Sequence, residues 1–177
     1  MANGEVTVAR LWTWVQRARA TEWDARFGEQ LPRIYNFFRY RVGDGPEAED
    51  LTSVTFEKAW RARHRYRRDL AAFSTWLFAI ARNVAIDHQR SAHALVPLEQ
   101  AANVSAGATP EDEASNSSDA QRLASLMTGL TDRDRELLAL KYGAGMNNRA
   151  IARATGLSES NVGTILHRAI EALRARW

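Results

Sequence analysis

Between positions 61 and 68 the sequence reads Arg-Ala-Arg-His-Arg-Tyr-Arg-Arg, which is the densest cluster of positive charge in the chain. Cationic side chains bind the phosphates of a nucleic-acid backbone, and an aromatic ring stacks on an unpaired base, so this composition is typical of single-strand binding. A run of charge also occurs on ordinary solvated surfaces. We favour nucleic acid because the apolar helix expected at residues 74–90 brings Arg82, Asn83 and Arg90 beside the run.

Residues 147–165 have the layout of a helix-turn-helix. Gly156 allows the positive φ that a tight turn requires, and Ala152 is small at the point where the two helices cross. In such a motif the second helix enters the major groove of duplex DNA. A plain helical hairpin is the alternative. The residues expected at the DNA are Ser160, Asn161, Gly163, Thr164, His167 and Arg168, with Arg149 on the preceding helix.

The spacing of apolar residues predicts an all-α fold of two small helical domains, because these residues recur three and four positions apart. The first domain covers residues 1–91 and the second covers residues 119–177. The segment 92–118 is expected to be a flexible acidic linker, since its few apolar side chains cannot offset its ordering entropy. Pro46 and Thr131 mark helix starts. Helices are expected at residues 6–20, 22–41, 46–63, 74–90, 119–128, 132–142, 147–154 and 159–176.

Composition excludes several classes of protein. The chain has no cysteine and four scattered histidines, so we expect neither a metal site nor a cofactor. No stretch approaches the roughly 20 apolar residues of a membrane span, and the N-terminus lacks a signal-peptide pattern, so we expect a cytoplasmic protein without membrane insertion.

The charges are distributed unevenly along the chain. Residues 1–91 carry 15 basic and 11 acidic side chains, residues 92–119 carry no basic and 5 acidic side chains, and residues 120–177 carry 9 basic and 5 acidic side chains. The two basic blocks indicate a polyanionic partner.

Two groups of motifs resemble those of the bacterial extracytoplasmic-function (ECF) sigma factors. Residues 48–60 (AEDLTSVTFEKAW) and 73–87 are similar to their region 2, and residues 130–168, which begin LTDRDRELL, are similar to their region 4. The resemblance implies a sigma factor without catalysis of its own, which directs core polymerase to promoters, melts the minus-ten element and serves transcription under stress. It implies core RNA polymerase, double-stranded and melted promoter DNA, and an anti-sigma factor as partners.

The resemblance also implies roles for individual residues of the first domain. Glu49, Asp50, Thr55 and Glu57 are similar to a surface that docks on basic clamp helices of the polymerase. The loop at residues 64–73 is similar to one that receives a flipped-out base, with Tyr66 as a wall, Ile80 as the floor and Asn83 as a hydrogen-bond partner. The residues expected at the minus-ten strand are Arg63, Arg65, Tyr66, Arg67, Arg68, Ile80, Arg82, Asn83 and Arg90.

The sequence departs from the family pattern at two places. Gly163 and Ile165 stand where the recognition helix usually has basic residues, and no Arg or Lys precedes Arg168 in this helix. A helix that reads guanine normally presents such a side chain. The loop after Tyr66 is also one residue longer than usual. We therefore predict that promoter binding depends more on the first domain than is typical of the family.

Three other interpretations use the same residues. A two-component output regulator has a DNA-binding domain that begins near a pattern like Leu130–Glu136, but residues 1–90 show no α/β receiver. A sigma-like module that binds only proteins is compatible with the weak recognition helix, and binding to a minus-ten single strand with core polymerase would distinguish it. An enzyme is disfavoured because the acidic residues at positions 44–50 have no histidine partner and no Gly-rich phosphate loop.

Overall fold

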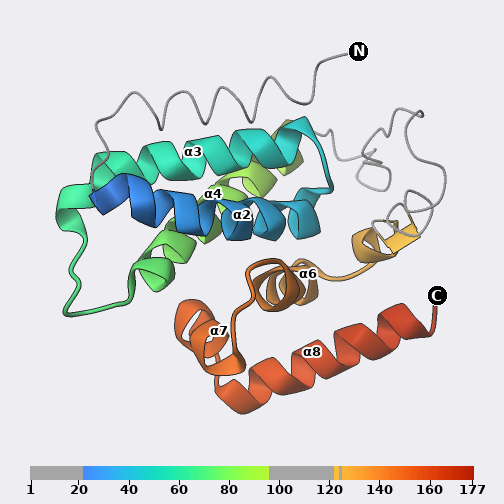
Figure 1. Cartoon of the computed structure of the whole chain (residues 1–177). Helices are drawn as coiled ribbons and strands as arrows, with labels where there is room; N and C mark the ends of the chain where they lie inside the picture. Colours follow the sequence, from blue (N-terminus) through green and yellow to red (C-terminus); the bar gives the residue numbers. More distant parts are fainter. Residues whose placement is uncertain (1–21, 96–121, 124) are drawn as a thin grey trace.

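The computed structural model describes residues 22–95, 122–123 and 125–177. Within these ranges every regular element is a helix, which confirms the all-α prediction, and none of the described helices is long and apolar enough to cross a membrane. The helices form two groups along the chain (Figure 1). The helix expected at residues 6–20 and the linker beyond residue 95 lie outside the described residues. Of the helix expected at residues 119–128, positions 122–123 and 125–128 are described and helical.

The first group contains α2 (Glu22–Val42), α3 (Pro46–Ala62) and α4 (Phe73–Leu95). Between α2 and α3, Gly43 and Gly45 take φ values of 94° and 131°, which side chains disfavour. Pro46 then lies in the first turn of α3, as predicted, where its missing N–H costs no helical hydrogen bond. Phe37 and Phe78 are fully buried between the helices, with ring centroids 5.9 Å apart. This aromatic pair joins α2 to α4.

Two helix ends differ from the prediction. α3 ends at Ala62, and a 3-10 turn, η1 (Arg63–Arg65), carries Arg63 and Arg65 of the basic run. α4 continues to Leu95, although residue 91 was the expected limit of the first domain. The extension follows from the sequence, because no Gly or Pro interrupts residues 74–95 and Pro97 comes only after them.

The second group contains α6 (Asp132–Leu138), η2 (Ala139–Gly143), α7 (Asn148–Thr155) and α8 (Glu159–Arg174). Side chains cap three of these helices: Thr131 Oγ1, Asn147 Oδ1 and Ser158 Oγ accept hydrogen bonds from backbone N–H groups at 3.2, 2.8 and 3.2 Å. Gly156 takes a φ of 73° in the turn between α7 and α8. These features confirm the predicted helix-turn-helix and the capped helix start at Thr131.

The predicted helix at residues 132–142 changes its hydrogen bonding halfway. After Leu138 the chain forms a π-helical turn, η2, in which Ala144 N donates to Ala139 O at 2.9 Å. Such turns are wider than the α-helix and often accompany functional sites. Here the turn ends at Gly143, where an added Cβ would meet the backbone of Asn36 in the first group.

The two helical groups pack directly on one another. α2 contacts η2 and α6, while α4 contacts α7, and the buried apolar side chains of both groups form a single cluster. A Cβ atom on Gly143 would lie only 2.7 Å from the backbone oxygen of Asn36. The sequence predicted two small helical domains, and the buried apolar side chains of the two groups meet in one cluster at the contact between them.

Candidate polymerase and nucleic-acid interfaces

One face of α3 presents acidic side chains around an apolar one. Asp50, Val54 and Glu57 follow one another at helical spacing and are exposed, and Glu49 is half-buried beside them. Glu57 accepts a hydrogen bond from Arg61 at 2.5 Å. Val54, which is 37% exposed, was missed by the sequence analysis, although its position four residues after Asp50 was an available signal. Carboxylates around an exposed apolar side chain suit a basic protein surface.

Thr55 does not belong to this acidic face. Its side chain is fully buried, and its hydroxyl donates to the backbone oxygen of Leu51 at 2.8 Å. The prediction that Thr55 contacts polymerase is therefore wrong in this structure, where Thr55 is a core residue. The reason is helical periodicity, which places Thr55 on the same side of α3 as Leu51, Thr52 and Ala59, toward the core.

Exposed arginines crowd the segment between α3 and α4. Arg67 donates two hydrogen bonds to Asp69, at 3.0 and 2.8 Å, and these bonds lower the pKa of Asp69. Arg68 pairs with Glu22 at 2.5 Å. Exposed pairs of this kind stabilise a protein little, so phosphates can replace the carboxylates at small cost. The exposed arginines of the predicted minus-ten set in this segment are Arg63, Arg65, Arg67 and Arg68.

Tyr66 lies at the edge of an aromatic cluster beneath these arginines. Its ring centroid is 6.0 Å from that of Trp23, 5.6 Å from that of Phe73 and 5.2 Å from that of Trp76. Its hydroxyl donates to the backbone oxygen of Ala71 at 3.2 Å. The half-buried ring is therefore held in one orientation with part of its surface accessible.

The same cluster connects Tyr66 with the helix that carries Ile80 and Asn83, the other residues of the expected base pocket. Trp76, which was not among the expected pocket residues, precedes Ile80 by four residues, and Ile80 precedes Asn83 by three, so the three share one face of α4. Ile80 is half-buried and Asn83 is exposed. Because Tyr66 contacts Trp76, the structure brings an aromatic ring, an apolar side chain and an exposed amide to one side of the first group. We call this set of residues (Tyr66, Trp76, Ile80 and Asn83) the α4 aromatic face.

Arg82 points away from the α4 aromatic face. Its side chain is 19% exposed; Nε donates to Glu136 Oε1 at 2.8 Å, and Nη1 donates to the backbone oxygen of Ala154. In this structure the Arg82 side chain is occupied by these partners and is not available for the expected contact with the minus-ten strand. The reason is that Arg82 follows Ile80 by only two residues, which places it on nearly the opposite side of the helix.

Arg90 lies nearer the end of α4 and is exposed. Together with Ile86, Gln89 and Asp132 it lines an open hollow between the two helical groups. Arg90 thus lies apart from the arginines of the η1 segment, although both were assigned to one nucleic-acid surface.

No three His, Asp or Glu side chains among the described residues come together as metal ligands.

The outer side of α8 carries the side chains expected at the DNA groove. α8 packs on α6 and α7. Arg149 on α7 is also exposed and pairs with Glu159 at 3.5 Å. Gly163 is half-buried, and a Cβ there would be in ordinary contact, 3.6 Å from the side-chain nitrogen of Asn148 on α7. The exposed groove-side residues are Ser160, Asn161, Thr164, His167 and Arg168.

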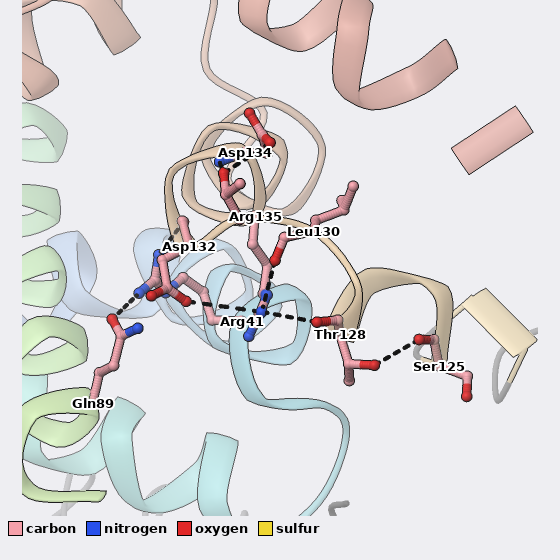
Figure 2. A network of polar contacts seen from close by, with 9 residues as sticks. Arg41, Gln89, Ser125, Thr128, Leu130, Asp132, Asp134 and Arg135 are labelled. Atoms are coloured by element: carbon pink, nitrogen blue, oxygen red, sulfur yellow. Dashed lines mark hydrogen bonds and ion pairs between the residues drawn. The ribbon is translucent and has the colours of Figure 1, made fainter. Parts of the chain in front are cut away.

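The residues that join the two groups were not predicted from the sequence. Arg33 Nε donates to the backbone oxygen of Ala144 at 2.8 Å. Figure 2 shows Arg41 of α2 between Gln89 of α4 and Asp132 of α6, with contacts of 3.5 and 3.4 Å. Burial lowers the pKa of Arg41, and the neighbouring Arg135 acts in the same direction. In the sequence these arginines look like ordinary solvated charges, so no local signal marks them.

Comparison with known proteins places both helical groups in one family. The model of Sigma-70 region 2 matches residues 27–94, and the model of Sigma-70 region 4 matches residues 120–173. The RNA polymerase sigma factor CarQ of Myxococcus xanthus is 33% identical over 151 residues, which are 84% of this chain and 84% of CarQ. The ECF sigma factor BldN of Streptomyces coelicolor is 30% identical over 171 residues, which are 93% of this chain but 65% of BldN.

Solved structures share the arrangement of helices. The sigma factor RpoE, in the co-crystal structure with the anti-sigma factor NepR from Bartonella quintana, matches 89% of this chain and 97% of that chain. The TM-score is 0.72 at 21% sequence identity, so this likeness shows the fold. The region 2 match contains the first helical group, and the region 4 match contains the helix-turn-helix. With two consecutive domain matches and a relative of similar length, the chain belongs to the ECF sigma factors of the sigma-70 family.

Proposed function

We propose that this chain directs core RNA polymerase to promoters through three separate surfaces. The acidic face of α3 binds polymerase, the α4 aromatic face and the neighbouring arginines hold the melted minus-ten strand, and the outer side of α8 meets upstream duplex DNA. The observation that carries the proposal is the placement of Tyr66 against Trp76, beside Ile80 and Asn83 and next to exposed arginines. The chain contributes binding and no catalysis of its own, and it acts in the cytoplasm with polymerase.

Strand opening follows from binding that favours the melted state. A base that leaves the stack loses stacking and pairing energy, and the opened strand forms only where a protein supplies replacements. Tyr66 offers a ring face and Asn83 offers an amide with two donors and an acceptor. The arginines of the η1 segment neutralise the backbone next to this site. The chain thus lowers the free energy of the open promoter relative to the duplex.

The α3 face supplies the contact with polymerase. Its exposed carboxylates lie in a group whose other charges are mostly basic, and they therefore attract a basic protein surface while nucleic acid is held elsewhere. The partner class includes anti-sigma factors, because RpoE, which has the same fold, was crystallised with one. Such a partner would compete with polymerase for the same exposed surfaces.

Asp50→Lys tests the polymerase surface. The charge reversal is expected to lower the affinity for core polymerase roughly tenfold or more, because like charges then meet across the interface. Run-off transcription with purified core enzyme and binding by fluorescence anisotropy measure the effect. Glu29→Lys, at an exposed position on α2, is the matched control and should bind like the parent protein. Equal affinity of the Asp50→Lys variant and the parent would refute the assignment of this face.

Thr164→Ala and Arg168→Ala test the weight of the upstream contact. Because α8 presents no arginine or lysine before Arg168 among its groove-side residues, we expect these variants to lose only a few-fold in transcription. The loss of a phosphate contact at Arg168 should also reduce the salt dependence of DNA binding by about one unit of slope. Footprinting on promoter DNA at several salt concentrations measures both. A severe loss of protection at the upstream element would contradict the expectation.

A further inference from the structure

The groove side of α8 has a gap at Gly163. This glycine follows Ser160 by three residues and precedes His167 by four, so it shares a side of the helix with these two exposed residues. Glycine offers no side chain to a base. A Cβ at Gly163 would lie 3.6 Å from Nδ2 of Asn148, which belongs to α7. The side chain beside the gap therefore comes from α7 rather than from α8.

Lys141 determines which end of the Asn148 amide faces Gly163. The Lys141 ammonium donates a hydrogen bond to Asn148 Oδ1 at 2.9 Å. An ammonium has no acceptor, so it selects the amide oxygen and leaves Nδ2 on the side of Gly163. Lys141 lies in η2 and Asn148 is the first residue of α7. Both residues are half-buried, so each is held in place and keeps an accessible part.

We propose that Asn148 and Lys141 supply the guanine contact that α8 lacks, by presenting N–H donors to O6 and N7 of a guanine in the upstream duplex. The inference rests on the proposed function, because it places the outer side of α8 against that duplex. Asn148 Nδ2 carries two N–H groups, and the Lys141 ammonium keeps two after its bond to Asn148. Guanine presents two neighbouring acceptors in the major groove.

The bond between Lys141 and Asn148 decides which base the pair prefers. An asparagine with a free amide reads adenine, since its oxygen accepts from N6 while its nitrogen donates to N7. Here an ammonium occupies the amide oxygen. Its positive charge would face the N6 amino group of adenine, whereas it attracts the O6 atom of guanine. The pair thus acts as a set of donors, which an isolated asparagine does not.

Gly163 keeps the space in front of Asn148 Nδ2 open. Its backbone does not require glycine, because the described glycines with positive φ are Gly43, Gly45, Gly145 and Gly156. Packing does not require it either, since a Cβ would make only ordinary contact. Glycine inside a helix is less stable than alanine. What it provides here is access from the groove to the donors of Asn148.

Asn148→Asp is the decisive variant. It keeps an acceptor for Lys141 and removes both N–H donors from the place beside Gly163. Holoenzyme of the full chain with core polymerase is incubated with promoter duplexes whose upstream element is randomised, and the bound fraction is sequenced. The parent is expected to prefer guanine at one position roughly fivefold or more. The variant should lose this preference and keep those at the other positions. Its added negative charge weakens binding to every sequence alike.

Two further variants change the same site in different ways. Lys141→Met frees the amide oxygen, so the preference at this position should move from guanine toward adenine. Lys141→Arg keeps a donor for the amide and should keep guanine. Gly163→Leu places a side chain in front of Nδ2 and should remove the preference, while α8 remains helical by circular dichroism. Lys141 is in these terms a positioning residue as well as a donor.

Glu171→Ala is the matched control. Glu171 is exposed near the end of α8, and its truncation should leave the base preferences unchanged. Guanine preference retained by Asn148→Asp would overturn the assignment of Asn148. Equal loss at all positions would also overturn it, because an asparagine that only supports the fold affects every sequence alike.

Run-off transcription by the parent on a fixed promoter separates this inference from the proposed function. A parent that transcribes without guanine preference in the upstream element refutes the guanine contact and leaves the proposed function intact. A parent that binds core polymerase but does not transcribe refutes the proposed function itself. Transcription together with a guanine preference that Asn148→Asp abolishes is the result that we expect.

Discussion

Replacement of Phe37 by alanine is expected to lower the free energy of unfolding by about 3–5 kcal/mol. The Phe37 side chain is fully buried, and its ring packs edge-on against Phe38 and Phe78 at centroid distances of 5.1 and 5.9 Å. The truncation removes apolar burial and leaves a cavity that these neighbours fill only in part. Urea denaturation followed by circular dichroism measures the loss.

Leu70→Ala is the matched control for this prediction. Leu70 is 75% exposed in the loop before α4, so its truncation should change the free energy of unfolding by less than about 0.5 kcal/mol. Because the buried apolar side chains of the two groups form one cluster, the Phe37→Ala loss should also appear in signals from the second group. A loss below about 1 kcal/mol for Phe37→Ala, or two separate transitions in the parent, would contradict the shared core.

Tyr66→Ala is expected to weaken binding to a minus-ten single strand, in the presence of core polymerase, by roughly 5- to 150-fold. This range corresponds to the about 1–3 kcal/mol that one aromatic stack on a base contributes. Tyr66 is oriented by Trp23, Phe73 and Trp76, so its ring is available without a large entropic cost. Anisotropy titration with a labelled oligonucleotide measures the change, and run-off transcription should fall in parallel.

Tyr66→Phe distinguishes the role of the ring from the role of the hydroxyl. The phenyl ring keeps the stacking surface and the aromatic contacts, while the hydrogen bond to Ala71 O is lost. We expect strand binding within about fivefold of the parent, since one hydrogen bond at a half-buried site contributes about 1 kcal/mol or less. If the Phe variant bound as weakly as the Ala variant, the ring face would not be the binding element. A thermal melt of both variants reports any damage to the cluster.

Local features of the sequence were sufficient for the elements and for the exposed parts of the site. Helical periodicity and the absence of strand patterns predicted the helices of the described residues, and Gly156 and Ser158 predicted the turn and cap of the helix-turn-helix. The arginines at positions 63, 65, 67 and 68 and the outer residues of α8 are exposed, as a contact with nucleic acid requires. These features depend on neighbours within about one helical turn, which a single sequence displays directly.

Helix ends and side-chain directions were predicted less well. Continuation of α4 to Leu95 depended on the lack of a helix breaker rather than on apolar spacing. Thr55 was assigned to a surface by its place in a motif, but the periodicity of α3 turns it into the core. The first error concerns how far a helix runs, and the second concerns which side of a helix a residue occupies. The helical spacing of α3 contained the information needed to place Thr55 in the core.

The contact between the two groups was decided by tertiary structure alone. Gly143 lies against Asn36 and Arg82 lies against Glu136, although more than fifty residues separate each pair in the chain. A pairing over such a distance leaves no periodic pattern, because each partner satisfies only the local rules of its own helix. The sequence therefore determined which helices form and what they expose, while the packing of the folded chain determined that Arg82 faces a carboxylate instead of solvent.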